Sequence, residues 1–213
     1  MRRLPLLAVV VALAACGGSK HAATTSTQSA SPGCTTVAAP KAGARREKKP
    51  VAALDPAKTY RIVMQTNCGT FTITLDVKEA PHTTASLVSL VQHGFFDRTI
   101  FHRIVPGFVI QGGDPTQTGT GGPGYTTLDT PPKNAKYVHG VVAMAKTAAQ
   151  PAGTSGSQFF IVTAKDAGLP PDYAVVGRVT KGLGVVDRIG KLGDVNQQPT
   201  QVVEIEKATV AES

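Results

Sequence analysis

Residues 101–114 read FHRIVPGFVIQGGD, and they carry the strongest structural signal in the chain. Apolar and β-branched side chains on both sides of Pro106-Gly107 predict two short strands, residues 101–105 and 108–111. Proline and glycine are turn residues, so we expect the second strand to fold back beside the first. The segment therefore predicts two adjacent strands joined by a tight turn.

The sequence on both sides of this segment continues the pattern of short strands. The further strands that we expect cover residues 60–64, 71–75, 140–145, 158–162, 174–179 and 202–208. Helices are expected over residues 81–93 and 185–189, because Pro81 suits a first helical position and Gly94 suits a helix end. The glycine-rich residues 112–136 predict a loop. Many short strands and two helices favour a mainly β fold, a closed antiparallel barrel with helices at its ends.

The net charge of +8 on 213 residues is unevenly distributed. Residues 17–57 hold six basic and two acidic residues, whereas residues 58–213 hold fourteen basic and twelve acidic ones. The predicted folded part is therefore nearly balanced and lacks the basic surface that nucleic acid requires. We expect no nucleic-acid partner, and we interpret the basic head as a segment that lies near anionic lipid head groups.

The N-terminus has the features of an export signal. Arg2 and Arg3 precede an apolar stretch of 12 residues, Leu4 to Ala15, which is shorter than the roughly 20 residues of a membrane-spanning helix. The sequence Leu13-Ala14-Ala15-Cys16 resembles the lipobox of bacterial lipoproteins, in which the cysteine is lipidated and the signal is removed before it. This resemblance implies lipidation at Cys16, export, and a lipid anchor on the outer face of the bacterial cell membrane.

The chain is thereby divided into three predicted parts. Residues 1–15 form a lipoprotein signal peptide, and residues 16–57 form a flexible tether whose composition cannot bury a core. Residues 58–210 form one domain.

Two cysteines remain if Cys16 is lipidated, and disulfides persist outside the cytoplasm. Cys34 lies in the tether, and Cys68 lies in a turn between two predicted strands. We predict a Cys34–Cys68 disulfide that pins the tether to the domain; the alternative is two free thiols.

Residues 101–114 also resemble the signature of cyclophilins. A second block, Gly156 to Ile161, reads GSQFFI and matches a second cyclophilin motif. Shorter matches follow in the same order as in the family: Ala80 to Thr83, Gly119 to Gly122, and Met144-Ala145. The resemblance covers roughly residues 60–208. It implies an eight-stranded closed antiparallel barrel capped by two helices and a peptidyl-prolyl cis-trans isomerase without a cofactor, whose partners are proline-containing polypeptides.

The residues suit that chemistry. Rotation about the bond before proline meets a barrier of ~18–20 kcal/mol, and a catalyst must favour the twisted state, in which the nitrogen gains a lone pair. Arg103 is the candidate donor, because its guanidinium stays charged. Strand alternation places Val109 and Gln111 on one face, so Gln111 can orient Arg103 or the substrate backbone. The apolar pocket for the proline ring is expected to consist of Phe108, Val109, Phe160 and Leu169.

The resemblance adds further residues around the groove. It implies substrate contacts from His102, Gln158 and Tyr173, and a backbone contact from Lys146, with Ala145 beside it, to the carbonyl before proline. The chain departs from the family where many members have Trp and this sequence has Gly168, so we expect weak inhibition by cyclosporin. Residues 147–153 form a longer loop than is common, which leaves the groove rim there undefined.

Two other functions compete with catalysis. One is a binding module or chaperone that holds proline-containing segments without turnover, and the other is a lipoprotein that only tethers partners at the envelope.

Residues 119–124 satisfy a dinucleotide-binding GxGxxG pattern on paper, but Pro123 and the surrounding glycines do not predict the helix that such a site needs. The histidines are scattered and no CxxC or HExxH motif occurs, so we expect no metal. No feature of the sequence requires an oligomer, so we expect a monomer.

Overall fold

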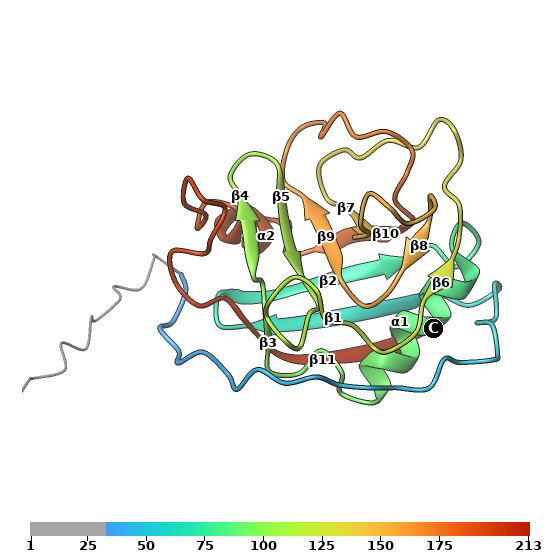
Figure 1. The fold of residues 1–213 in the computed structure, drawn as a ribbon, viewed down its shortest axis with the longest axis horizontal. Coiled ribbons are helices and arrows are strands. Elements are labelled where there is room, and N and C mark those ends of the chain that lie inside the picture. Colours follow the sequence, from blue (N-terminus) through green and yellow to red (C-terminus); the bar gives the residue numbers. More distant parts are fainter. Residues whose placement is uncertain (1–32) are drawn as a thin grey trace, which may run out of the picture.

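The computed structural model describes residues 33–213, which form a curled antiparallel sheet with a helix at each end (Figure 1). The expected signal peptide and Cys16 lie outside the described residues. The strands are β1 (Tyr60–Thr66), β2 (Gly69–Leu75), β3 (Thr99–Ile100), β4 (Arg103–Val105), β5 (Val109–Gly112), β6 (Thr127–Leu128), β7 (Val141–Met144), β8 (Thr154–Ser155), β9 (Phe159–Val162), β10 (Val175–Lys181) and β11 (Glu204–Glu212), and the helices are α1 (Pro81–Gln92) and α2 (Leu183–Ile189). Within residues 33–213, no helix has the length and apolar character needed to cross a membrane.

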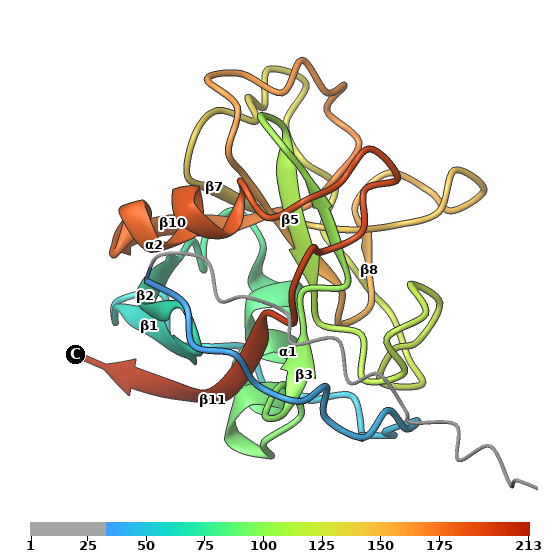
Figure 2. The same ribbon diagram turned by 90° about the vertical axis from the view of Figure 1, so that its left-hand side faces the viewer.

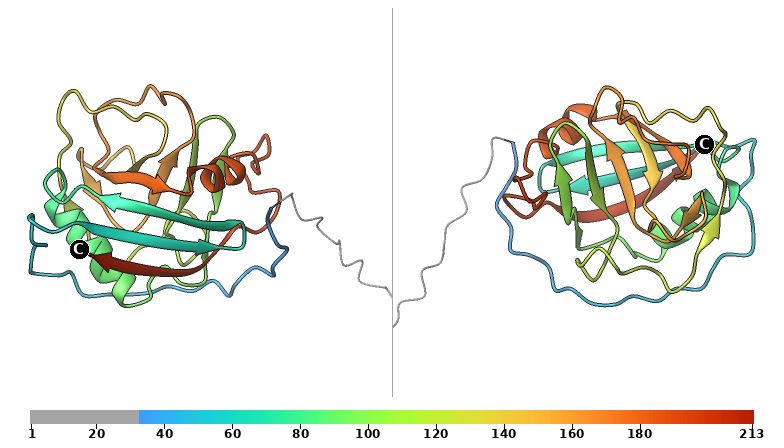
Figure 3. Two further views of the ribbon diagram at one scale, coloured as in Figure 1. Left: turned by 180° about the vertical axis from the view of Figure 1, so that it is seen from behind. Right: turned by 45° about the horizontal axis from the view of Figure 1, so that its top comes forward.

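Nine strands form the main sheet, in the order β3-β11-β1-β2-β10-β7-β9-β5-β4, and β6 pairs with β8 separately. The expected mainly β fold is confirmed, and the described strands form a curled half-barrel (Figure 3), whereas a closed barrel of eight strands was expected. The first and last strands of this order, β3 and β4, are separated by only two residues of the chain. The expected strand over residues 101–105 is broken at Phe101-His102, since the chain changes partners there. The N–H of Phe101 donates to Val203 on the β11 side, whereas β4 pairs with β5.

The first hairpin and both helices confirm the local predictions. β1 and β2 pair antiparallel through a turn in which Thr66 faces Gly69, and Gly69 has a φ of +120° that favours glycine. Helix α1 begins at Pro81, as expected, and the chain leaves it through Gly94 with a φ of +68°. α1 and α2 lie at opposite ends of the sheet (Figures 1 and 3).

Aromatic rings fill the centre of the larger core. Phe101, at the break between β3 and β4, is fully buried and meets Phe159 of β9 edge to face, with ring centroids 6.0 Å apart. Phe159 in turn meets Phe96 edge to face at 5.9 Å, and Phe96 lies in the turn after α1. These contacts fix the β3–β4 break relative to both the sheet and the helix.

Residues 33–57, which we call the strap, contain no helix or strand but lie against the domain along the β11 side of the sheet (Figures 1 and 2). The predicted disulfide joins Cys34 to Cys68 in the β1–β2 turn. The side chain of Asn67 also links the strap to the domain at this point, because its Nδ2 donates to the carbonyl oxygens of Thr35 and Val202 at 2.7 and 3.0 Å. The strap was expected as part of a flexible tether, and its composition gave no sign of these contacts.

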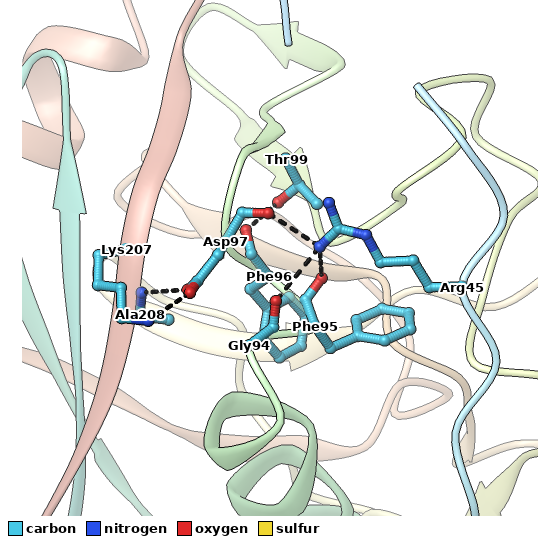
Figure 4. Close-up of polar contacts among 8 residues, drawn as sticks. All are labelled: Arg45, Gly94, Phe95, Phe96, Asp97, Thr99, Lys207 and Ala208. Atoms are coloured by element: carbon cyan, nitrogen blue, oxygen red, sulfur yellow. Dashed lines mark hydrogen bonds and ion pairs between the residues drawn. The ribbon is translucent and has the colours of Figure 1, made fainter. Parts of the chain in front are cut away.

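Arg45 is the second fixed point of the strap (Figure 4). Its guanidinium donates to the carbonyl oxygens of Gly94, Phe95 and Asp97, which lie in the turn after α1. The other side of that turn is held by β11, since the N–H of Ala208 donates to the Asp97 carboxylate at 3.0 Å. The strap is therefore fixed at both ends of the curled sheet.

The disulfide should contribute measurably to stability. It closes a loop of 34 residues, for which chain entropy predicts a loss of up to about 4 kcal/mol in the free energy of unfolding after reduction. Denaturant unfolding with and without reductant measures this loss, and reductant should not affect a Cys34→Ser/Cys68→Ser variant. Alkylation of both cysteines in non-reduced, denatured protein would contradict the disulfide.

Candidate active site

The register of three neighbouring strands brings the predicted polar residues together. Arg103 on β4 lies directly opposite Gln111 on β5, and Gln111 lies opposite Phe160 on β9. Directly opposed residues in antiparallel strands place their side chains on the same face. The structure therefore puts a guanidinium, an amide and an aromatic ring in one row.

A chain of hydrogen bonds fixes the Arg103 side chain. Its Nη1 donates to Gln111 Oε1 at 3.2 Å, and Gln111 Nε2 donates to Gln158 Oε1 at 3.0 Å. Gln158 Nε2 donates to the Gly121 carbonyl at 2.9 Å, which ends the chain in the loop after β5. On its other side, Arg103 Nε donates to Gln197 Oε1 at 2.7 Å.

Both side-chain partners of the guanidinium are neutral amides. Among residues 33–213, no acidic side chain forms an ion pair with Arg103. The geometry of Arg103 is therefore fixed while its positive charge stays uncompensated and half-buried. Such a donor can stabilise electron density that develops on a bound molecule.

Apolar residues form a separate small cluster beside this row. Val109 and Phe160 are buried, and Phe108, Leu169 and Tyr173 pack against them while remaining half-buried. All the residues predicted for the apolar pocket are thus in one cluster. A partly open apolar surface next to a fixed cation can hold a small ring beside a polar group.

Tyr137 belongs to this cluster and was missed by the sequence analysis. Its buried hydroxyl donates to the Tyr173 carbonyl at 2.7 Å and accepts from the Tyr173 N–H at 3.0 Å. Burial raises the pKa of the Tyr137 hydroxyl above its usual value, although backbone hydrogen bonds at Tyr173 and Asp172 oppose this. Tyr137 therefore holds Tyr173 against Phe160. The rings of Tyr173 and Phe160 meet edge to face, with centroids 5.4 Å apart. A single tyrosine in a loop-like stretch gave no periodic signal.

The side chain of Lys146 points inward rather than into solvent. Its Nζ lies 2.6 Å from an Asp172 carboxylate oxygen and 3.1 Å from the Gln150 carbonyl, and only 3% of the side chain is exposed. The backbone N–H of Lys146 donates to no residue in the described part of the chain. This N–H is thus free to donate to a bound carbonyl, and the contact expected from the sequence stays a prediction.

Asp114 fixes the loop that follows β5. Its buried carboxylate accepts backbone N–H bonds from Thr116, Thr118, Gly119 and Gly121 at 2.7 to 3.1 Å. Burial by itself raises the pKa of Asp114, but the hydrogen bonds from Thr116, Gly121 and Gly119 outweigh it, so the pKa lies below the usual value. One carboxylate therefore holds the loop that contains Gly121, whose carbonyl is the last acceptor in the series of hydrogen bonds that begins at Arg103.

His102 lies beneath this loop rather than in the open groove. Both ring nitrogens are buried and have no hydrogen-bond partner in residues 33–213. Burial lowers the pKa of His102 below its usual value; the charge of Asp114 opposes this and that of Arg103 adds to it. His102 is therefore neutral at pH 7 and serves as packing under Gly119, where an added Cβ would lie 3.8 Å from Nε2.

A cavity of about 770 Å³ lies beside the apolar cluster rather than over it. Gln111, Gln158, Ala145 and Lys146 line its inner side, so it opens directly onto the predicted site. Residues 33–213 contain no group of three or more His, Cys, Asp or Glu side chains that could hold a metal ion. The arrangement suits the binding of an extended peptide, with a small ring in the apolar cluster.

Comparison with known proteins identifies related chains. Residues 61–210 match the family described as cyclophilin type peptidyl-prolyl cis-trans isomerase/CLD. The chain is 38% identical over 160 residues to a peptidyl-prolyl cis-trans isomerase-like 1 protein of Gibberella zeae, covering 72% of this chain and 96% of that protein. It is 36% identical to a peptidyl-prolyl cis-trans isomerase of Helicobacter pylori, covering 67% of this chain and 93% of that one.

A solved structure shares the fold. The crystal structure of a cyclophilin type peptidyl-prolyl cis-trans isomerase from Cryptosporidium parvum superimposes with a TM-score of 0.66 and 29% identity. The match covers 72% of this chain and 98% of that one.

His102, whose ring nitrogens are buried, should make stability depend on pH. Because the folded-state pKa is lowered, the unfolded chain binds more protons, so the free energy of unfolding falls as pH decreases from about 6.5 and levels off below the folded-state pKa. Denaturant unfolding between pH 7 and pH 4.5 should show this fall, and a His102→Gln variant should be flatter over the same range.

A second, separate loss is expected below about pH 5, as the carboxylate of Asp114 becomes protonated in the unfolded chain around its usual pKa of 3.8 while the fold still holds it ionised. This loss should persist in His102→Gln and serves as its internal control. Equal slopes for both proteins between pH 7 and pH 4.5 would contradict the assignment to His102.

Proposed function

The chain belongs to the cyclophilin-type peptidyl-prolyl cis-trans isomerase family, and we propose that Arg103 is its catalytic residue. The protein is accordingly a peptidyl-prolyl cis-trans isomerase, which accelerates rotation about the bond before proline. The uncompensated charge of Arg103, held by neutral amides beside an apolar cluster, is the observation that carries the residue assignment.

The chemistry requires only that the twisted bond be bound more tightly than the planar one. As the C–N bond rotates, the proline nitrogen loses conjugation and becomes an acceptor. A guanidinium N–H directed at this nitrogen stabilises the twisted state but not the planar one, because the planar amide nitrogen accepts no hydrogen bond. The barrier to rotation is therefore lowered. Arg103 has the charge, and Gln111 and Gln197 hold it in place.

The remaining residues would orient the substrate. The proline ring would lie on the apolar surface of Phe108, Val109, Phe160 and Leu169, which pack in one cluster. The N–H of Lys146 would hold the carbonyl before proline. This carbonyl would then stay fixed while the part of the substrate on the other side of the C–N bond rotates.

Binding without catalysis is the competing role for the same geometry. A binding module needs the apolar cluster and the Lys146 N–H, but it gains nothing from a fixed, unpaired cation. The hydrogen-bonded placement of Arg103 therefore favours catalysis over binding alone.

Replacement of Arg103 should separate these roles. Loss of one positioned donor to a transition state typically costs about a hundredfold or more in kcat, so Arg103→Ala should lose roughly that much isomerase activity. An exchange or protease-coupled assay on a short Xaa-Pro peptide measures this. Arg61→Ala, which removes an arginine on β1, is the matched control and should keep full activity. Full activity in Arg103→Ala would refute the assignment.

We further propose that the enzyme acts on exported proteins from a lipid anchor at Cys16 and assists their folding there. The apolar stretch before Leu13-Ala14-Ala15-Cys16 supports this proposal. The Cys34–Cys68 disulfide also supports it, because disulfides persist in oxidising compartments outside the cytoplasm.

Substitution of Cys16 tests the anchor. The full chain expressed in bacteria should sediment with membranes, and its N-terminal peptide should carry the mass of acyl chains at Cys16. Cys16→Ser should shift the protein to the soluble fraction, whereas Cys68→Ser should leave it with the membranes. A soluble wild-type protein with an unmodified Cys16 would overturn this proposal.

A further inference from the structure

The strap forms one wall of the cavity that opens onto the active site. Ala44, Arg45 and Arg46 line it opposite Gln111 and Gln158. The family match begins at residue 61, so this wall comes from outside the part of the chain that matches the family. Any specificity it confers is a property of this chain's own N-terminal extension.

The charged residues that line this cavity are all basic: Arg45, Arg46 and Lys146. Two of them are engaged, because Lys146 pairs with Asp172, and Arg45 donates to three carbonyl oxygens. Arg46 is exposed, and its guanidinium has no hydrogen bond or ion pair within residues 33–213.

The neighbours of Arg46 are held on both sides. The N–H of Gly43 donates to the Pro115 carbonyl at 3.0 Å, and the N–H of Glu47 donates to the Pro123 carbonyl at 2.9 Å. Between them, Arg45 is anchored to the turn after α1 (Figure 4). The backbone of Arg46 is therefore fixed relative to the loop that Asp114 organises.

The position of the guanidinium follows from this anchoring. A Cβ added to Gly124 would lie 3.2 Å from Arg46 Nη1, so the side chain lies over that glycine at the cavity wall. The acidic residue next to Arg46 in the sequence, Glu47, does not line the cavity. Its charge adds to burial, the larger cause, in raising the pKa of the Tyr125 hydroxyl. Among the basic residues that line the cavity, Arg46 is thus the one whose guanidinium is free of both hydrogen bonds and ion pairs within residues 33–213, and it lines the same cavity as Gln111 and Gln158.

We propose that Arg46 forms a subsite for an acidic side chain of the substrate, a few residues from the proline. The proposal rests on the isomerase function above, because it assumes that the proline lies in the apolar cluster. An extended chain advances about 3.5 Å per residue, so it crosses a cavity of this size within roughly three residues. A carboxylate at one of these positions would meet the Arg46 guanidinium.

Peptide pairs test this directly with the full-length protein. Each pair is identical except for Glu or Gln at one position, scanned over the residues before and after proline, and kcat/KM is measured for both members. At one position, Glu should be preferred about three- to fivefold, as for a partly exposed ion pair, and the preference should shrink at high salt.

Variants identify the cation responsible. Arg46→Gln should reduce the Glu/Gln ratio at that position to about one, whereas Arg46→Lys should keep part of the preference. Lys48→Gln is the matched control, because it removes the same charge from an exposed strap residue that does not line the cavity, and its ratio should equal that of the wild type.

The outcomes separate the two proposals. No catalysis with either member of any pair would reject the proposed function itself. Catalysis with equal rates for Glu and Gln at every position, or equal loss of preference in Arg46→Gln and Lys48→Gln, would overturn the subsite. Thermal unfolding of each variant checks that the fold is retained, and a ratio within one variant is insensitive to partial loss of active protein.

Discussion

Antiparallel pairing between β4, β5 and β9 is the constraint that assembles the active site. It sets Arg103 opposite Gln111 and Gln111 opposite Phe160, and so places one row of side chains on one face. A shift of one residue in either pairing would turn Arg103 or Gln111 to the opposite face of the sheet. The Pro106-Gly107 turn prevents this shift between β4 and β5, since its length defines the register. The buried contact of Phe101 with Phe159 ties the start of the same segment to β9.

The electrostatics of the site depend on how its buried carboxylate is used. Asp114 ends the segment that begins with Phe101, and its oxygens accept backbone N–H groups of the following loop rather than a cation. Arg103 is left with the amides of Gln111 and Gln197, which hold it without neutralising it. The same molecule thus contains an anion satisfied by neutral donors and a cation satisfied by neutral acceptors. This separation keeps the positive charge available for a substrate.

Local sequence patterns predicted most of the fold and the residues of the site. The β1–β2 hairpin, both helices and the paired β4–β5 segment follow from spacing and turn residues that lie within a few positions of each other. Gln197 and Tyr137 were missed because they act on Arg103 and Tyr173, which are far away in the chain. The strap was missed for the same reason, since Arg45 is held by carbonyl oxygens about 50 residues away, which leave no trace in composition. The split of one expected strand into β3 and β4 could not be predicted, because local patterns do not reveal where a chain changes partners.

If the anchor proposed at Cys16 is present, the covalent link between the strap and the β1–β2 turn also limits how far the domain can move from it. For an anchor at Cys16, the chain between lipid and domain ends at Cys34 rather than near Lys58. Its greatest span falls from roughly 150 Å to roughly 60 Å. The volume that the active site can search around its anchor then shrinks by about an order of magnitude, because volume scales with the cube of reach. The disulfide would thereby confine catalysis to polypeptides that emerge close to the membrane surface.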